Sequence, residues 1–149
     1  MARIVLSPSE MYLATTVACM RMIEDIFANR SDRYGADKKN GFQLHIMGAI
    51  GELAVAKFLG VFWNGNLGNL KAPDVGFVQV RSRSEQWHSL ILHPADSDDD
   101  LFYLVTVQDY VCDVVGYIRG RDGKHPSHWD DPARGRPAFF VKQEYLVLV

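Results

Sequence analysis

This 149-residue sequence has few cysteines, no net positive charge and few long apolar runs. The two cysteines, Cys19 and Cys112, lie in apolar runs without CxxC spacing, so we expect buried reduced thiols and no disulfide framework. The formal charge of −2 argues against a protein that coats nucleic acid through an overall basic field, and leaves only a local patch for such contacts. No apolar run approaches the ~18 residues of a membrane helix, so we expect a cytoplasmic protein without a membrane partner.

The composition that is present suits one globular domain. With 48% hydrophobic and 23% charged residues, the chain has enough material for a sizeable core. No internal repeat is visible, and the apolar start of the chain is too short for the hydrophobic part of a signal peptide. We therefore predict a single domain over residues 1–149.

Two helices are predicted in the first part of the chain. Ser7, Pro8 and Glu10 form the pattern of a helix start, with Ser7 as the cap, Pro8 at the first position and Glu10 completing a capping box. Apolar residues then recur near one face, which is typical of a scaffold helix. A second helix is predicted over residues 41–59, because Gly60 suits a C-terminal cap.

Short apolar stretches separated by turns predict strands in the rest of the chain. The strands are expected at residues 61–63, 78–83, 90–92, 101–107, 110–119 and 138–141. The nearly continuous apolar run 101–107 indicates a central strand covered on both faces. In the strand 110–119, Asp113 is expected to face solvent. The closing segment is expected to pack through three side chains: Tyr145, Leu146 and Leu148.

Three polar stretches could hold ligands, but each has a simpler explanation. Residues 29–40 carry basic side chains that could touch phosphates, although a solvated loop is the favoured interpretation: Arg30, Arg33, Lys38 and Lys39. Residues 96–100 are acidic but lack the glycine and the distant glutamate of an EF-hand, which favours a solvated turn over a calcium site. Residues 120–137 form a predicted loop, in which a zinc set is conceivable but disfavoured: His125, His128, Asp130 and Asp131.

Glu52 is the most informative residue of the second helix. It shares a stripe with His45 and Gly48 at spacings of three and four, so the carboxylate lies on a face that another segment can approach closely. Burying a glutamate there is costly unless a cation receives it. A ligand role is favoured over a structural ion pair with Arg81 or Arg83. His45 itself is more often an ordinary helix histidine than a functional one.

Residues 72–83 contain a second acidic residue and the most regular alternation in the chain. Asp74 precedes a turn at Gly76, and the strand that follows places three polar side chains on one face: Gln79, Arg81 and Arg83. Shortly after this strand, Trp87 could stack on a base, although packing beneath the sheet is favoured.

Together these pieces resemble the active site of the PD-(D/E)xK nuclease superfamily. In that superfamily a helix carries a glutamate, the next hairpin an aspartate, and the neighbouring strand an acidic residue, any residue and a lysine. The matching positions here are Glu52, Asp74, Gln79 and Arg81, so glutamine replaces the usual carboxylate and arginine the usual lysine. The resemblance implies an α/β (α+β) fold of restriction-endonuclease type, with a mixed central sheet flanked by helices and the N-terminal helices packed on the sheet.

The resemblance also implies a catalytic centre. Glu52, Asp74 and the side-chain carbonyl of Gln79 would hold Mg²⁺ or Mn²⁺, which are hard cations that prefer oxygen ligands. Arg81 stays protonated, so it would stabilise charge and position phosphate rather than act as a general base.

Arg81, Arg83 and His45 are the expected contacts to nucleic acid, with DNA favoured over RNA. The implied function is a metal-dependent nuclease, a DNA endonuclease of phage or prophage type that acts in the cytoplasm of a bacterial host cell. The alternative is a nuclease-like fold that has lost catalysis and binds nucleic acid or a protein partner. The missing charge at Gln79 favours that alternative, and a homodimer stays open in both cases.

Overall fold

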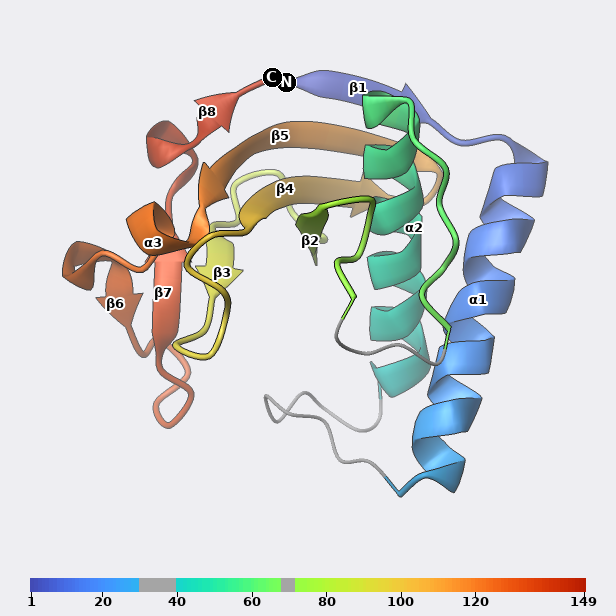
Figure 1. Cartoon of the computed structure of the whole chain (residues 1–149), viewed down its shortest axis with the longest axis horizontal. Helices are drawn as coiled ribbons and strands as arrows, with labels where there is room; N and C mark the ends of the chain where they lie inside the picture. The colour runs from blue at the N-terminus through green and yellow to red at the C-terminus, as the bar shows by residue number, and fades with distance from the viewer. Residues whose placement is uncertain (30–39, 68–71) are drawn as a thin grey trace.

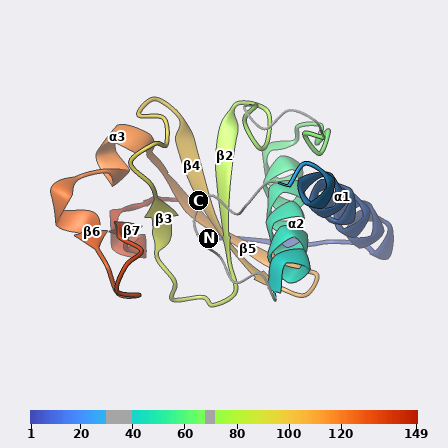
Figure 2. The same ribbon diagram turned by 90° about the horizontal axis from the view of Figure 1, so that it is seen from below.

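The computed structural model describes residues 1–29, 40–67 and 72–149. In these ranges the chain forms three layers, seen in Figure 2: a pair of helices, a five-stranded sheet and a three-stranded sheet. The fold is therefore mixed α and β, as predicted. The helices flank one face of the larger sheet, and the smaller sheet covers the other. The basic side chains expected in a loop lie outside the described residues: Arg30, Arg33, Lys38 and Lys39.

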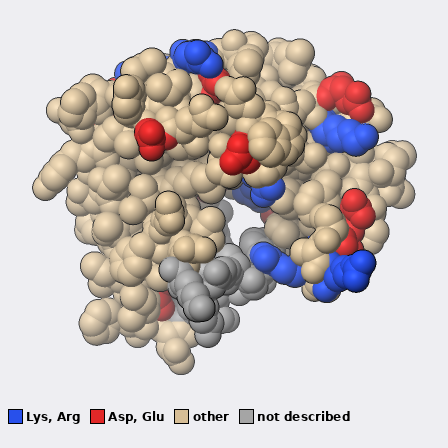
Figure 3. Space-filling model, turned by 180° about the vertical axis from the view of Figure 1, so that it is seen from behind, with Lys and Arg blue, Asp and Glu red and all other residues tan. Residues whose placement is uncertain are grey.

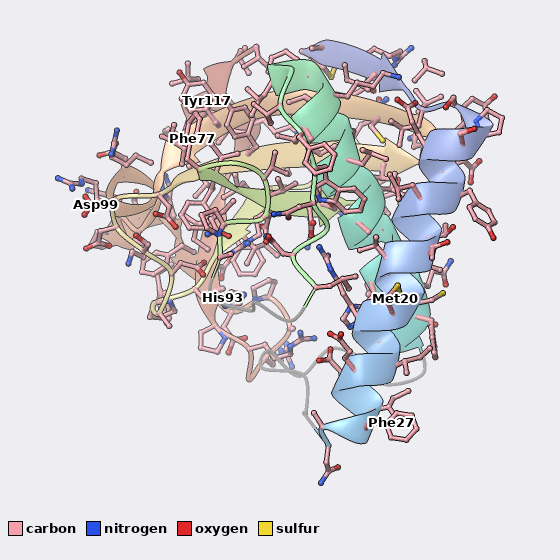
Figure 4. All side chains as sticks on the ribbon, turned by 45° about the vertical axis from the view of Figure 1, so that its right-hand side comes forward. Met20, Phe27, Phe77, His93, Asp99 and Tyr117 are labelled. Carbon is pink, nitrogen blue, oxygen red and sulfur yellow. The ribbon has the colours of Figure 1, made fainter. Side chains whose placement is uncertain are left out.

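Helix α1 (Pro8–Phe27) begins at the predicted capping box. The Ser7 hydroxyl accepts a hydrogen bond from the Glu10 backbone at 3.2 Å, and the Ser7 backbone N–H donates to the Glu10 carboxylate at 2.7 Å. The outer side of α1 is apolar, with Met20 45% and Phe27 88% exposed. Figure 4 shows Phe27 at the end of the helix, directed away from the other elements.

Helix α2 (Gly41–Leu59) lies between α1 and the larger sheet (Figures 1 and 2). Both helices were predicted to pack on the sheet, but α1 packs mainly on α2. Helix α2 ends at Gly60, whose φ of 68° is the left-handed conformation of a glycine cap. Residues 49–56 of α2 are all buried. By length and apolar composition α2 is also the one described helix that could cross a membrane. In this structure its apolar residues form the centre of the core.

The larger sheet is mixed, as predicted. Its strand order is β1 (Ala2–Val5), β5 (Val111–Arg119), β4 (Leu101–Gln108) and β2 (Val78–Arg83). Only the pair β2 and β4 is parallel. A short strand, β8 (Val147–Leu148), pairs with β5 beyond the end of β1, which brings the two chain termini side by side (Figure 1). Strand β1 was not predicted from the sequence.

The smaller sheet contains β3 (Leu90–Leu92), β7 (Ala138–Val141) and β6 (Trp129–Asp130) in that order. It creates a second core against β4 and β5, whose members include Phe102, Leu104 and Val115. The first core lies between α2 and the opposite face of the larger sheet. Strand β4 is therefore covered on both faces, as its continuous apolar run predicted.

Two further expectations were wrong. Residues 61–63 do not join a sheet, and Trp63 is instead buried, at 6% exposed. Asp113 does not face solvent: it is 4% exposed and pairs with Arg3, with 2.9 Å between Asp113 Oδ1 and Arg3 Nε. Arg3 comes from the unpredicted strand β1, so a partner for this carboxylate could not be recognised from the sequence.

The last part of the chain is more ordered than predicted. The expected loop 120–137 contains α3 (Gly120–Gly123), the 3-10 turn η2 (Pro126–His128) and β6. The closing segment forms a second 3-10 turn, η3 (Gln143–Tyr145), before β8. Of the three side chains expected to pack there, only Leu146 is buried, because the others stand on the outside of these short elements: Tyr145 and Leu148.

Candidate active site

Glu52 is buried, at 7% exposed, in the middle of α2. The close approach of α2 to β2 depends on its neighbour Gly51, because a Cβ atom there would lie 2.0 Å from the Ser82 hydroxyl oxygen. The Glu52 carboxylate is received by Arg21 of α1, whose two terminal nitrogens donate to its two oxygens at 2.8 and 2.7 Å. The Trp63 indole N–H donates to the same carboxylate at 3.1 Å.

Arg21, and not Arg81 or Arg83, is therefore the ion-pair partner of Glu52. Burial lowers the pKa of Arg21, but the hydrogen bonds and charge of Glu52 outweigh that effect and leave the pKa raised. Sequence reasoning missed Arg21 and Trp63. A usable signal was charge complementarity between antiparallel helices, since α1 and α2 are also joined by a pair between Glu10 and Lys57, 2.9 Å apart.

Asp74 stands at the free edge of β2. The chain turns at Gly76, with a φ of 53°, and Val75 bridges back to Val78. One Asp74 carboxylate oxygen then accepts a hydrogen bond from the Val80 backbone N–H at 2.8 Å. This acceptor occupies the place that a neighbouring strand would otherwise take, because β2 is the last strand of the larger sheet.

The electrostatics tie Asp74 to Glu52. The pKa of Asp74 is raised to about 6, first by burial and then by the negative charge of Glu52, against the opposing effects of the Val80 N–H, Arg81 and Arg21. The two carboxylates predicted from the motif thus lie within one electrostatic cluster, which also includes both arginines. They share no hydrogen bond between them.

Gln79 and Arg81 lie on the face of β2 that points away from α2. The Gln79 side-chain amide donates to the Asp100 carboxylate at 3.0 Å. Arg81 is held by the carboxylate of Asp96 at 3.0 Å and by the backbone carbonyl of Ile91 at 3.2 Å. Both acidic partners come from the run 96–100, which the sequence suggested was a solvated turn. Hydrogen bonds from Gln79 and Arg81 instead hold this run against β2.

His45 and Arg83, the other two expected contacts to nucleic acid, have different surroundings. His45 lies toward α1, with its Nε2 atom 3.6 Å from the Asp25 carboxylate. Arg83 makes no hydrogen bond or ion pair with the described residues, and its Nε atom is buried without a partner. Seen from behind, the surface is hollowed near its centre, with Lys and Arg side chains along the edge of the hollow (Figure 3).

No family model, curated protein or solved structure matches this chain. A function is therefore inferred from the chemistry of the cluster itself. Glu52, Asp74 and Arg81 come from three separate segments, and burial sharpens the electrostatic interactions among them.

The fit of this cluster to a divalent cation is partial. Within residues 1–29, 40–67 and 72–149, no group of three or more His, Cys, Asp or Glu side chains is arranged to hold a metal ion. Glu52 and Asp74 would supply two hard oxygen ligands, whose negative charges a cation would neutralise. In this structure the Arg21 guanidinium neutralises Glu52, so a cation would have to replace or join it.

The disfavoured metal sets are not assembled in the described residues either. His125 contacts the Ser127 hydroxyl at 2.7 Å, and His128 contacts the Gly123 carbonyl at 3.0 Å. Both histidines therefore make local hydrogen-bond contacts within their own turn. In the acidic run, Asp98 is paired with Lys124, which matches a structural turn better than a calcium loop.

Proposed function

We propose that this chain is a metal-dependent nuclease, with DNA favoured over RNA, built on a fold of restriction-endonuclease type. One observation carries the proposal: Asp74 at the β2 edge and Glu52 of α2 lie close enough for the charge of one to raise the pKa of the other. Two like charges held together in a buried setting are costly unless a cation or a proton intervenes. Such pairs are typical of functional sites.

Phosphodiester hydrolysis requires an activated water and a positive charge beside the phosphoryl oxygens. Glu52 and Asp74 would hold Mg²⁺ or Mn²⁺, and that cation would supply the activated water. Gln79 faces away from α2 and is bonded to Asp100, so it would have to leave Asp100 to act as a third ligand, and a weak one, because an amide contributes a lone pair but no charge. Arg81 keeps its proton and stabilises negative charge developing on the phosphate.

Binding the cation would involve two changes in the protein. Asp74 must lose its proton, which happens above about pH 6. Glu52 must exchange at least one of its hydrogen bonds to Arg21 for the cation. Arg21 would stay anchored by the Gly65 backbone carbonyl, to which its Nε atom donates at 3.0 Å.

The second candidate is a module that binds nucleic acid or a protein partner without cleaving it. The bidentate bond from Arg21 to Glu52, reinforced by Trp63, favours this candidate because the arginine already supplies the positive charge. Both candidates share a cytoplasmic location without a membrane partner, and a phage-encoded protein would act inside its bacterial host cell.

A cleavage assay separates the two candidates. Plasmid and single-stranded DNA are incubated with Mg²⁺, Mn²⁺ or EDTA. We expect cleavage with either metal, none with EDTA, and none for Asp74→Asn. The matched control is Asp109→Asn, a surface turn residue away from the cluster, which should cleave like the wild type. Retained DNA binding without cleavage under every metal would establish the binding module instead.

A further inference from the structure

The loop between β2 and β3, residues 84–89, presents an aromatic side chain to solvent. Trp87 is 75% exposed, which overturns the expectation that it packs beneath the sheet. The loop is anchored from below, because the Gln143 side-chain amide donates to the backbone carbonyls of Gln86 and His88, the latter at 3.0 Å. This anchoring holds the main chain while the indole points outward. An exposed large aromatic on a fixed loop is a common recognition device.

An open depression lies beside Trp87. Its volume is about 480 Å³, and it is lined by Trp87, Ser89, Lys142, Gln143 and Glu144. Because the depression is open to solvent, it can support one face of a ring but does not enclose a ligand. Lys142 and Glu144 carry opposite charges, so the depression has no preference for an anion. It suits a flat, neutral, hydrogen-bonding ring.

Arg83, just before the same loop, and His88, within it, each have a polar ring or guanidinium atom without a partner among the described residues. Arg83 Nε and His88 Nδ1 are both buried without a hydrogen-bond partner in the described part of the chain. The terminal nitrogens of Arg83 make no hydrogen bond to the described residues either. Leaving a guanidinium partly buried and unpaired costs free energy, so an acceptor with negative charge would stabilise it.

Electrostatics connect the two side chains. Burial lowers the pKa of His88 and the charge of Arg83 lowers it further, while Glu85 opposes the change. His88 is therefore a neutral hydrogen-bonding group beside a permanent cation. Its ring also contacts Trp87 edge to face, with 5.5 Å between the ring centres. Cation, imidazole and indole thus follow one another within a short segment.

We propose that Trp87, Arg83 and His88 form a subsite for one nucleotide of a single-stranded nucleic acid. The base stacks on Trp87 over the depression, and the adjoining phosphate binds the terminal nitrogens of Arg83, with the His88 ring beside it. Because duplex bases are already stacked and paired, the indole can stack only on an unpaired base. This subsite rests on the proposed function in one respect, that the bound strand belongs to the substrate. It adds that the substrate has an unpaired stretch beside the cleavage site.

Binding measured in EDTA tests the subsite apart from cleavage. The probes are a fluorescein-labelled single-stranded 12-mer of DNA and the duplex of the same sequence. We expect the single strand to bind more tightly than the duplex, and Trp87→Ala and Arg83→Gln each to weaken single-strand binding about tenfold. The controls are Trp129→Ala, an exposed tryptophan in β6, and Arg119→Gln, an exposed arginine in β5, which should bind like the wild type.

Tryptophan fluorescence gives a second readout that does not depend on Arg83. Stacking of a base should quench the emission of wild-type protein and of Trp129→Phe, but not of Trp87→Phe. Equal affinity for single strand and duplex, with no loss in Trp87→Ala, would overturn the subsite. The result also separates the two proposals. Variant-insensitive binding with metal-dependent cleavage removes the subsite and leaves the nuclease, whereas variant-sensitive binding without cleavage does the reverse.

Discussion

Arg21 and Glu52 form a bidentate ion pair across the interface between α1 and α2, with nitrogen to oxygen distances of 2.8 and 2.7 Å. Both side chains are largely shielded from water, at 19% and 10% exposed. Removing one partner of such a shielded pair is strongly destabilising, because it leaves the other charge buried and unpaired. The guanidinium also sits where a metal ion would have to compensate the same carboxylate, so Arg21 affects both folding and metal binding.

The first prediction concerns Arg21→Gln. The substitution leaves Glu52 buried with only Trp63 as a described donor, so we expect the free energy of unfolding to fall by about 3 kcal/mol. Mg²⁺ or Mn²⁺ should raise the melting temperature of this variant more than that of the wild type, because Glu52 then lacks its internal cation. Arg121→Gln is the control, since its pair with Asp99 is exposed and should contribute less than about 1 kcal/mol. A variant as stable as the wild type and indifferent to metal would contradict this role.

The second prediction concerns the pH dependence of stability through Asp74. Its folded pKa of about 6 lies above the ordinary value of 3.8, so folding takes up a proton between these two values. The stability contributed by this group is therefore full below about pH 4 and is lost as the pH rises through about 6. Asp74→Asn keeps an oxygen that accepts from Val80 but carries no charge. At pH 7 we expect this variant to be more stable than the wild type, by on the order of 2 kcal/mol.

Urea unfolding at several pH values checks this prediction. The stability advantage of Asp74→Asn should shrink as the pH is lowered toward 4, because the wild-type carboxyl group becomes neutral there. Asp109→Asn serves as the control for adding an amide on a turn. An advantage that is constant from pH 4 to 8 would show that Asp74 titrates normally.

The third prediction concerns Gln79→Glu. The substitution replaces the hydrogen bond to Asp100 by two facing carboxylates, so we expect a loss of about 1–2 kcal/mol in unfolding free energy at pH 7. Divalent cations should restore the loss, and under the nuclease proposal the variant should cleave DNA at lower Mg²⁺ than the wild type.

The double variant Gln79→Glu with Asp100→Asn provides the matching control. It rebuilds the hydrogen bond with donor and acceptor exchanged, and should regain most of the stability without added metal. A wild-type enzyme that is fully active at low Mg²⁺, and is made worse by Gln79→Glu, would show that Gln79 is not a metal ligand.

The fourth prediction compares the contributions of Arg81 and Arg83 to stability. The alternation in the sequence places both on one face of β2 and does not distinguish them. Arg81 is bound by Asp96 and stands over the Phe102 ring at 5.0 Å, whereas Arg83 has no described partner. Arg81→Ala should therefore lower the unfolding free energy by about 3 kcal/mol. Arg83→Ala should change it by less than about 1 kcal/mol. Chemical denaturation of both variants decides the point, and the opposite order would mean that Arg83 is the structural arginine.

Local chemistry made part of the fold predictable. The start of α1 follows from Ser7 and Glu10, and the end of α2 follows from Gly60, because each signal acts within one turn. The strand Ala2–Val5 was missed because its order comes from pairing with β5, more than a hundred residues away. Tertiary pairing of that kind leaves little trace in four residues.

The candidate site shows the same division. The burial of Glu52 could be inferred from the small residues of its helix, but its pairing with Arg21 depends on the register between two antiparallel helices. The alternation in β2 correctly grouped Gln79 with Arg81, yet it could not show that each would be held by an acidic residue of the run 96–100. Local patterns set which face a side chain occupies, and only the packed chain decides its partner.

The Asp74 carboxylate also closes the outer edge of the larger sheet. As the last strand of its sheet, β2 offers unpaired backbone groups to any other extended chain. Asp74 takes up the Val80 N–H, and the bridge between Val75 and Val78 closes the strand just before it. An incoming strand would have to expel a charged group to pair there. The residue proposed to hold the metal thus also protects the folded chain from edge-to-edge aggregation.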